Sequence, residues 1–176
     1  MSATFSTIKN KNRGTTLVEM ILYVVLLVFV MTVIVQMLIS IGGVYRNIKI
    51  TRELESSGTI AMEQMLREIR SASSVKISGS TFGTSPGSIT LSGFDESQNP
   101  YEVVFSVDSG VLKISKNGSS PVSLTSFPAS VSSLIFTHVI TSTYEGVQIK
   151  LEVFGTAGSV SKTAGFQSFT VLRGAY

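Results

Sequence analysis

Residues 14–46 read GTTLVEMILYVVLLVFVMTVIVQMLISIGGVYR, and this stretch decides the fold because it holds a long apolar run with one acid near its start. The 26 residues between Glu19 and Arg46 carry no charged side chain, and their most apolar part, Met20 to Ile41, has 22 residues. As a helix this part would be about 33 Å long, enough to cross a hydrocarbon core of roughly 30 Å. The sequence therefore predicts a transmembrane helix over residues 20–41.

The residues before this run form a basic leader. Residues 1–14 end in KNKNRG and carry three cations and no acid, which is the charge layout of a targeting segment. The apolar run is too long for a secretory signal peptide and does not end in a small-residue cleavage site, so we expect it to stay in the mature protein. We place the N-terminus in the cytoplasm and the chain beyond the helix outside it, in a single-pass arrangement.

The helix is predicted to continue past the membrane as an amphipathic stem, making one long helix over residues 15–71. Apolar residues recur at helical spacing at Val44, Ile48, Met62, Met65 and Ile69. Thr51, Glu55 and Gly58 interrupt this stripe, and the sequence leaves open a bend near Gly58 or at Gly42-Gly43. The methionines on the stripe are interpreted as the side that packs on the following domain.

From Val75 onward the period changes from helical to alternating, which predicts an antiparallel β domain over residues 75–176. Five or six strands are expected, from segments 89–91, 101–107, 111–115, 134–140, 147–153 and 166–172. The segments 78–88 and 95–100 are interpreted as loops, and 155–165 as a flexible hairpin tip. The predicted fold class is thus α+β, with a long N-terminal helix packed on a C-terminal antiparallel β-sheet.

Composition excludes several kinds of chemistry. The chain of 176 residues has no Cys and a single His, which excludes disulfides, thiolate metal sites and multi-histidine metal centres. No nucleophile elbow, phosphate-binding loop or histidine–carboxylate pair is visible, so we expect neither enzyme activity nor a cofactor. His138 is interpreted as a partly buried strand residue. Asp95 and Glu96, with Asp108, are interpreted as solvated turn residues in preference to a calcium site.

The motif Gly14-Thr15-Thr16-Leu17-Val18-Glu19, between a basic leader and a long apolar helix, resembles the processing site of type IV prepilins and of the related pseudopilins of type II secretion and competence systems. The resemblance implies that a prepilin peptidase cuts after Gly14 and methylates the new N-terminal amine of Thr15. Family members usually begin the mature chain with Phe or another apolar residue, whereas Thr15 stands here. Glu19 would be the acid at the fifth mature position, which aligns subunits in the filament by pairing with a neighbour's N-terminal amine.

The resemblance also implies partners and a location. Other pilin or pseudopilin subunits, an inner-membrane assembly platform and membrane lipid would contact the chain, which would sit in the cell membrane and then in a pilus or pseudopilus. Thr32, Gln36 and Ser40 lie on one helical face and are candidates for hydrogen bonds between helices, although three unrelated polar residues remain an alternative. The stem end around Arg67 and Arg70 and the late segment 169–173 resemble minor pseudopilins of the J type or pilins of the W type.

The net charge of +3 gives no support for nucleic acid as a partner. Removing residues 1–14 takes away three of the 14 Lys and Arg, and the remaining 11 equal the 11 Asp and Glu. Two functions stay open: a structural filament subunit, minor or major, and a solitary membrane-anchored β domain that binds a ligand or envelope component without polymerising.

Overall fold

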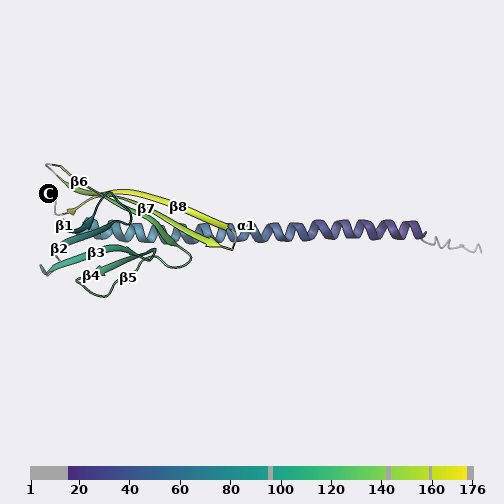
Figure 1. Ribbon diagram of the computed structural model, residues 1–176, viewed down its shortest axis with the longest axis horizontal. Coiled ribbons are helices and arrows are strands. Elements are labelled where there is room, and N and C mark those ends of the chain that lie inside the picture. The colour runs from purple at the N-terminus through teal and green to yellow at the C-terminus, as the bar shows by residue number, and fades with distance from the viewer. Residues whose placement is uncertain (1–15, 95–96, 142–143, 159, 174–176) are drawn as a thin grey trace, which may run out of the picture. The chain divides into compact units, whose positions relative to one another are not determined.

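The computed structural model describes residues 16–94, 97–141, 144–158 and 160–173 (Figure 1). The chain divides into two units, one up to Gly42 and one from Gly43 onward. A single helix of 55 residues, α1 (Leu17–Ser71), contributes to both units. The helix is continuous through Gly42-Gly43 and through Gly58, so neither position breaks it.

The first unit is the apolar part of α1. Its large apolar side chains from Leu17 to Ile41 are all between 46% and 76% exposed, so no other described residue covers them. Within the described residues α1 is the one helix that is long and apolar enough to cross a membrane. The predicted membrane-spanning segment therefore exists as a bare apolar helix, in agreement with a membrane anchor.

The second unit contains the stem of α1 and two antiparallel sheets. The first sheet has the order β1 (Ser74–Thr81), β2 (Ser88–Phe94), β3 (Pro100–Asp108), β4 (Val111–Lys116) and β5 (Val122–Ser123). The second has the order β6 (Ser130–Ile140), β7 (Glu145–Ala157) and β8 (Val160–Val171). Within each sheet, strands that follow one another in sequence pair antiparallel, whereas β5 and β6 belong to different sheets. The α+β prediction of a long helix packed on antiparallel β structure is confirmed.

The six predicted strands are all present, but two further strands and a second sheet were not predicted. The segment 78–88 was expected to be a loop, and residues 82–87 do form one, but β1 extends as far as Thr81. Its sequence SVKISGST buries only Val75, so backbone pairing with β2 holds it and no apolar alternation marks it. The prediction of a flexible tip over 155–165 is also wrong, because β7 and β8 pair up to Ala157 and Val160.

The stem supplies one face of the hydrophobic core. Its buried residues include Ile50, Leu54, Ala61, Met62, Met65 and Ile69. Met62, Met65 and Ile69 agree with the predicted stripe. Val44 and Ile48 do not, because they are 59% and 50% exposed. The buried face begins instead at Ile50 and Leu54, whose side chains approach the backbone of β7 at Gly155.

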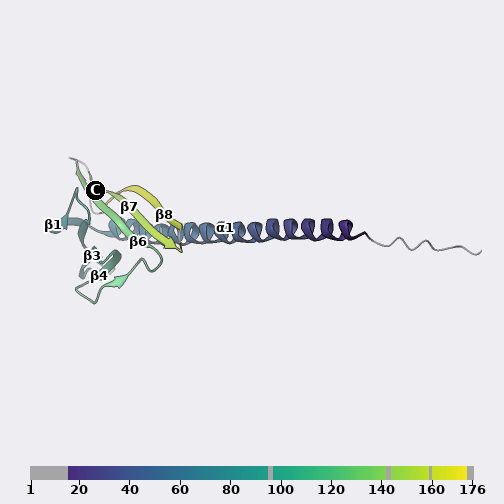
Figure 2. The ribbon, with the colours of Figure 1, turned by 45° about the vertical axis from the view of Figure 1, so that its right-hand side comes forward.

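Both ribbon views place the two sheets on different sides of the stem (Figures 1 and 2). The β1–β2 loop joins them through two backbone hydrogen bonds, from Gly83 N to Phe136 O at 2.9 Å and from Gly87 N to Leu134 O at 2.7 Å. The buried side chains of stem and sheets form one core, which includes Phe105 from β3 and Phe136 from β6. Each large side chain buried there contributes about 1.5–3 kcal/mol to stability.

Candidate functional site

The start of α1 is held by a local cap. The amide of Glu19 donates to the hydroxyl of Thr16 at 3.4 Å, and the amide of Met20 donates to the Thr16 carbonyl at 3.2 Å. Thr16 is therefore the N-cap of the helix and Glu19 its third residue, the order of a capping box. An acid in the first turn also interacts favourably with the helix dipole. The motif that predicts processing thus also begins the helix.

Glu19 has one partner beside this cap. The Tyr23 hydroxyl, one turn later, donates to Glu19 Oε1 at 3.0 Å. No hydrogen bond from a described residue reaches Glu19 Oε2, and no described cation pairs with Glu19. Tyr23 was not among the predicted site residues, although its spacing of four from Glu19 is the signal of a helical neighbour. The predicted cleavage residues Gly14 and Thr15 lie outside the described residues.

Only some of the polar side chains in the apolar segment form hydrogen bonds within the helix. The Thr32 hydroxyl donates to the carbonyl of Val28 at 2.9 Å, so its proton needs no second helix. The side-chain amide of Gln36 has no hydrogen-bond partner among the described residues. Gln36 and Thr32 line a shallow groove with Leu27, Val28, Met31 and Val35. Of the three predicted polar residues, Gln36 and Ser40 form no side-chain hydrogen bond with another described residue, whereas Thr32 does.

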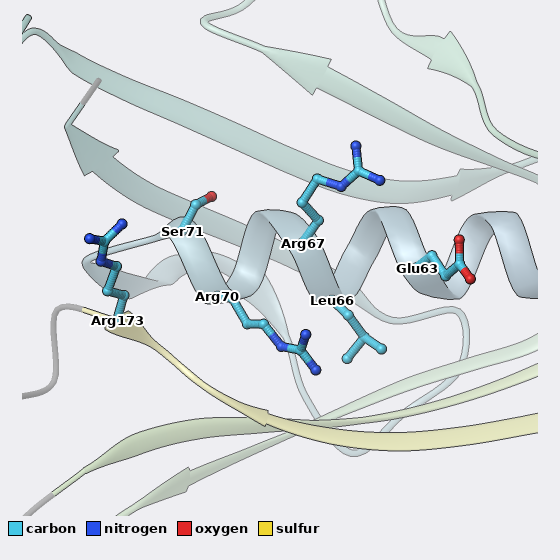
Figure 3. A pocket seen from close by; sticks show the side chains of 6 residues that line it. All are labelled: Glu63, Leu66, Arg67, Arg70, Ser71 and Arg173. Carbon is cyan, nitrogen blue, oxygen red and sulfur yellow. The ribbon is translucent and has the colours of Figure 1, made fainter. Parts of the chain in front are cut away.

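An open pocket of about 440 Å³ lies at the far end of the stem, lined by Glu63, Leu66, Arg67, Arg70, Ser71 and Arg173 (Figure 3). Arg70 Nε donates to the Thr170 hydroxyl at 3.1 Å, which ties the stem to β8. Figure 3 shows the three guanidinium groups pointing in different directions. They do not converge on one point, so the pocket lacks the geometry of a site for a single anion.

His138 is a partly buried residue of β6, as predicted, and it also has an acidic partner that the sequence did not reveal. Its Nε2 lies 2.7 Å from Glu145 Oε1, across the β6–β7 hairpin. The same carboxylate oxygen accepts from the Val75 amide at 3.2 Å, and the Phe82 ring stacks on the imidazole with centroids 5.3 Å apart. The pair therefore joins the second sheet to the first. No described Ser or Thr side chain is hydrogen-bonded to His138, whose hydrogen-bond partner is Glu145.

Of the three acids that were predicted to lie in solvated turns, the structure describes one, Asp108. Asp108 accepts hydrogen bonds from Lys113 and Ser109, which, with the lysine charge, lower its pKa. Asp95 and Glu96 lie outside the described residues. Among residues 16–94, 97–141, 144–158 and 160–173 there is no group of three or more His, Cys, Asp or Glu side chains placed to hold a metal ion.

A scan against protein-family models, a search of curated proteins and a search of solved structures each found no match to this chain. The functional conclusion accordingly depends on the residues themselves.

Proposed function

We propose that this chain is a structural subunit of a type IV pilus or of a type II secretion or competence pseudopilus. Its leader would be removed after Gly14 and the amine of Thr15 methylated. The observation that carries this proposal is the bare apolar half of α1, which starts at an acid, Glu19, and continues into a stem packed in a β domain. Such a helix is stable both in lipid and against other helices of its kind.

The cost of holding Glu19 in lipid favours association of this helix with a neighbouring subunit. An acid facing hydrocarbon costs up to ~2.5–3.5 kcal/mol on insertion scales, and Tyr23 engages only one of its oxygens. The amine of a processed neighbour would supply the missing donor and a positive charge. Because that amine exists only after cleavage, the pairing would couple processing to assembly. Buried ion pairs set register better than they add stability, so Glu19 is assigned to subunit alignment.

The same proposal names the partners. A prepilin peptidase would process the leader, an inner-membrane assembly platform would receive the subunit from the lipid bilayer, and other pilin or pseudopilin subunits would surround it. A minor or tip-proximal position fits the J-type and W-type resemblance. The β domain would lie outside the cytoplasm. Neither catalysis nor nucleic-acid binding is part of the proposed role.

Mass spectrometry of the chain extracted from membranes of a cell that carries a prepilin peptidase tests the proposal. The expected N-terminus is a methylated Thr15, and Gly14→Leu should leave the leader attached. An unprocessed N-terminus at Met1 would contradict the proposal and support a solitary membrane-anchored domain.

Glu19→Gln separates processing from assembly. This variant should be cleaved and methylated normally yet enter sheared filaments less than the wild type. Glu55→Gln, on the exposed stem, is the matched control and should enter normally. Equal incorporation of Glu19→Gln and wild type would overturn the alignment role.

A further inference from the structure

The start of the stem, the β5–β6 loop and the β7–β8 turn surround an open pocket of about 560 Å³. Tyr45, Arg46 and Lys49 line it from α1, and Phe127 lines it from the loop. Lys162 of β8 belongs to the same end of the domain, because it pairs with Gly155 two residues before Ala157, which also lines the pocket. We call these five residues, Tyr45, Arg46, Lys49, Phe127 and Lys162, the basic aromatic rim.

The rim exposes aromatic rings that the fold does not use. Phe127 is 90% exposed, more than any other large hydrophobic side chain among the described residues, and Tyr45 is 69% exposed. Phe127 fills no core position, so its ring contributes little to folding. Exposed aromatic side chains grouped at one end of a domain indicate contact with an apolar or interfacial surface.

The rim also carries positively charged side chains that form no ion pairs with acids of the described residues. Arg46, Lys49 and Lys162 are exposed, and none of them forms an ion pair with another described residue. One acid, Glu53, lines the same pocket as Arg46 and Lys49, so two cations share this pocket with one carboxylate. Elsewhere in the domain Lys76, Lys113 and Lys116 each pair with an acid. The unpaired cations of the rim therefore favour an anionic surface.

Chain connectivity identifies that surface. Only Gly42, Gly43 and Val44 separate Tyr45 from Ile41, the last residue of the apolar segment. Four residue steps span about 6 Å in a helix and at most ~14 Å fully extended. The headgroup layer is roughly 5–8 Å thick on each side of the hydrocarbon core. Because α1 is helical from Ile41 to Tyr45, the shorter span applies, and Tyr45 is held at the headgroup layer when the apolar segment spans a bilayer.

We propose that the basic aromatic rim binds the surface of an anionic phospholipid bilayer. The Tyr45 and Phe127 rings lie at headgroup level, and Arg46, Lys49 and Lys162 face the lipid phosphates. Aromatic and basic side chains are the residue types that anchor proteins at this interface. The proposal rests on membrane anchoring by α1 and does not require filament assembly. It docks the β domain on the bilayer as an unassembled subunit.

The absence of Trp from the chain permits a direct test. F127W places the sole tryptophan on the rim of the full-length protein. The matched control F94W places it at the opposite end of the domain, because Phe94 lines a pocket with Ser73, just past the end of α1. Phe94 is 59% exposed, so its side chain is also accessible to solvent. In vesicles of phosphatidylglycerol and phosphatidylcholine brominated near the headgroups, F127W emission should be blue-shifted and quenched, and F94W emission should not. Equal, unquenched emission from both variants would overturn the proposal.

A second arm tests the charge. Removing the three cations with R46Q, K49Q and K162Q in the F127W background should abolish the extra quenching seen with phosphatidylglycerol, while R67Q and R70Q should leave it unchanged. High salt should act like the rim variant. Equal quenching in phosphatidylcholine alone and in the mixture would overturn recognition of anionic lipid. None of these readouts depends on leader processing or filament incorporation, so this inference and the proposed function can fail separately.

Discussion

Gly58 of α1 lies so close to Phe166 of β8 that a Cβ at position 58 would be 2.1 Å from Phe166 Cε2. The glycine that weakens the stem in sequence is thus the residue that lets β8 approach the helix. Its cost in helix propensity, about 1 kcal/mol relative to Ala, is offset by this contact.

The sign of Gly58→Ala should depend on Phe166. In the wild-type chain the added methyl displaces the ring, and we expect a loss of about 1–2 kcal/mol, since overpacking outweighs the gain in propensity. In a Phe166→Ala background the same change should stabilise by roughly 0.5–1 kcal/mol. Thermal unfolding of the four proteins in detergent micelles measures this cycle. A stabilising effect in both backgrounds would show that the contact does not constrain the helix.

Lys116→Gln should destabilise the domain more than Lys113→Gln on the same strand. Lys116 pairs at 2.6 Å with Glu68, which is 7% exposed and also accepts from Gln64 at 2.8 Å. Losing the lysine leaves a buried carboxylate with one neutral donor, a cost of about 1–2 kcal/mol after allowing for the exposure of Lys116. The partner of Lys113, Asp108, is exposed to solvent, which screens the pair, so that change should cost clearly less. Denaturant midpoints of the two variants provide the comparison, and equal shifts would contradict the buried role of Glu68.

Asp108 should make a small contribution to stability that disappears in acid. Hydrogen bonds from Lys113 and Ser109, and the charge of Lys113, lower its pKa below the ordinary 3.8. The unfolded chain then binds more protons than the folded one around this pH. The contribution is therefore present above 3.8 and is lost as pH falls through the lower folded pKa. Asp108→Asn should melt below the wild type at neutral pH and match it in acid. A carboxyl titration of Asp108 by NMR should have its midpoint below 3.8 and move upward in Lys113→Gln.

Gln36→Leu should favour the membrane-inserted monomer over the filament. The Gln36 amide has no partner among the described residues, and interhelical hydrogen bonds in membranes average about 0.6 kcal/mol, so roughly a threefold drop in incorporation is expected. Thr32→Val should have a smaller effect, because the Thr32 hydroxyl already donates to Val28. Met37→Leu is the apolar control, and the ratio of filament to membrane pools is the measurement. An unchanged ratio for Gln36→Leu would leave the polar face without a role in assembly.

Local patterns predicted most of the elements because each depends on neighbours in sequence. Residues 20–41 are apolar whatever surrounds them, and the alternation at 101–107 and 147–153 identified β3 and β7. Strand β1 escaped prediction because its pairing with β2 is made by the backbone, and SVKISGST carries almost no alternation. The N-terminal part of the buried stripe was predicted at the wrong residues. Ile50 and Leu54 are buried because β7 packs against them, and helical spacing alone does not reveal where β7 packs.

Contacts of the candidate site residues also divide into those that local sequence predicts and those that only the folded chain creates. Glu19 and Tyr23 are one helical turn apart, so their contact follows from helix geometry. Glu68 and Lys116, or His138 and Glu145, meet only after strands have paired and packed. A single histidine with no acid in its own strand gives no sign of the carboxylate that the hairpin brings to it.

By itself the sequence determined a basic N-terminal segment, one apolar segment of 22 residues with Glu19 next to its start, and a β-rich remainder, because hydropathy and charge act through the chain itself. The tertiary structure alone decided that the β strands form two sheets and that Gly58 admits Phe166. It also decided that Phe127 joins Tyr45 and Arg46 around one pocket. These relationships join residues far apart in sequence, and they exist only because burying the core fixes which surfaces meet.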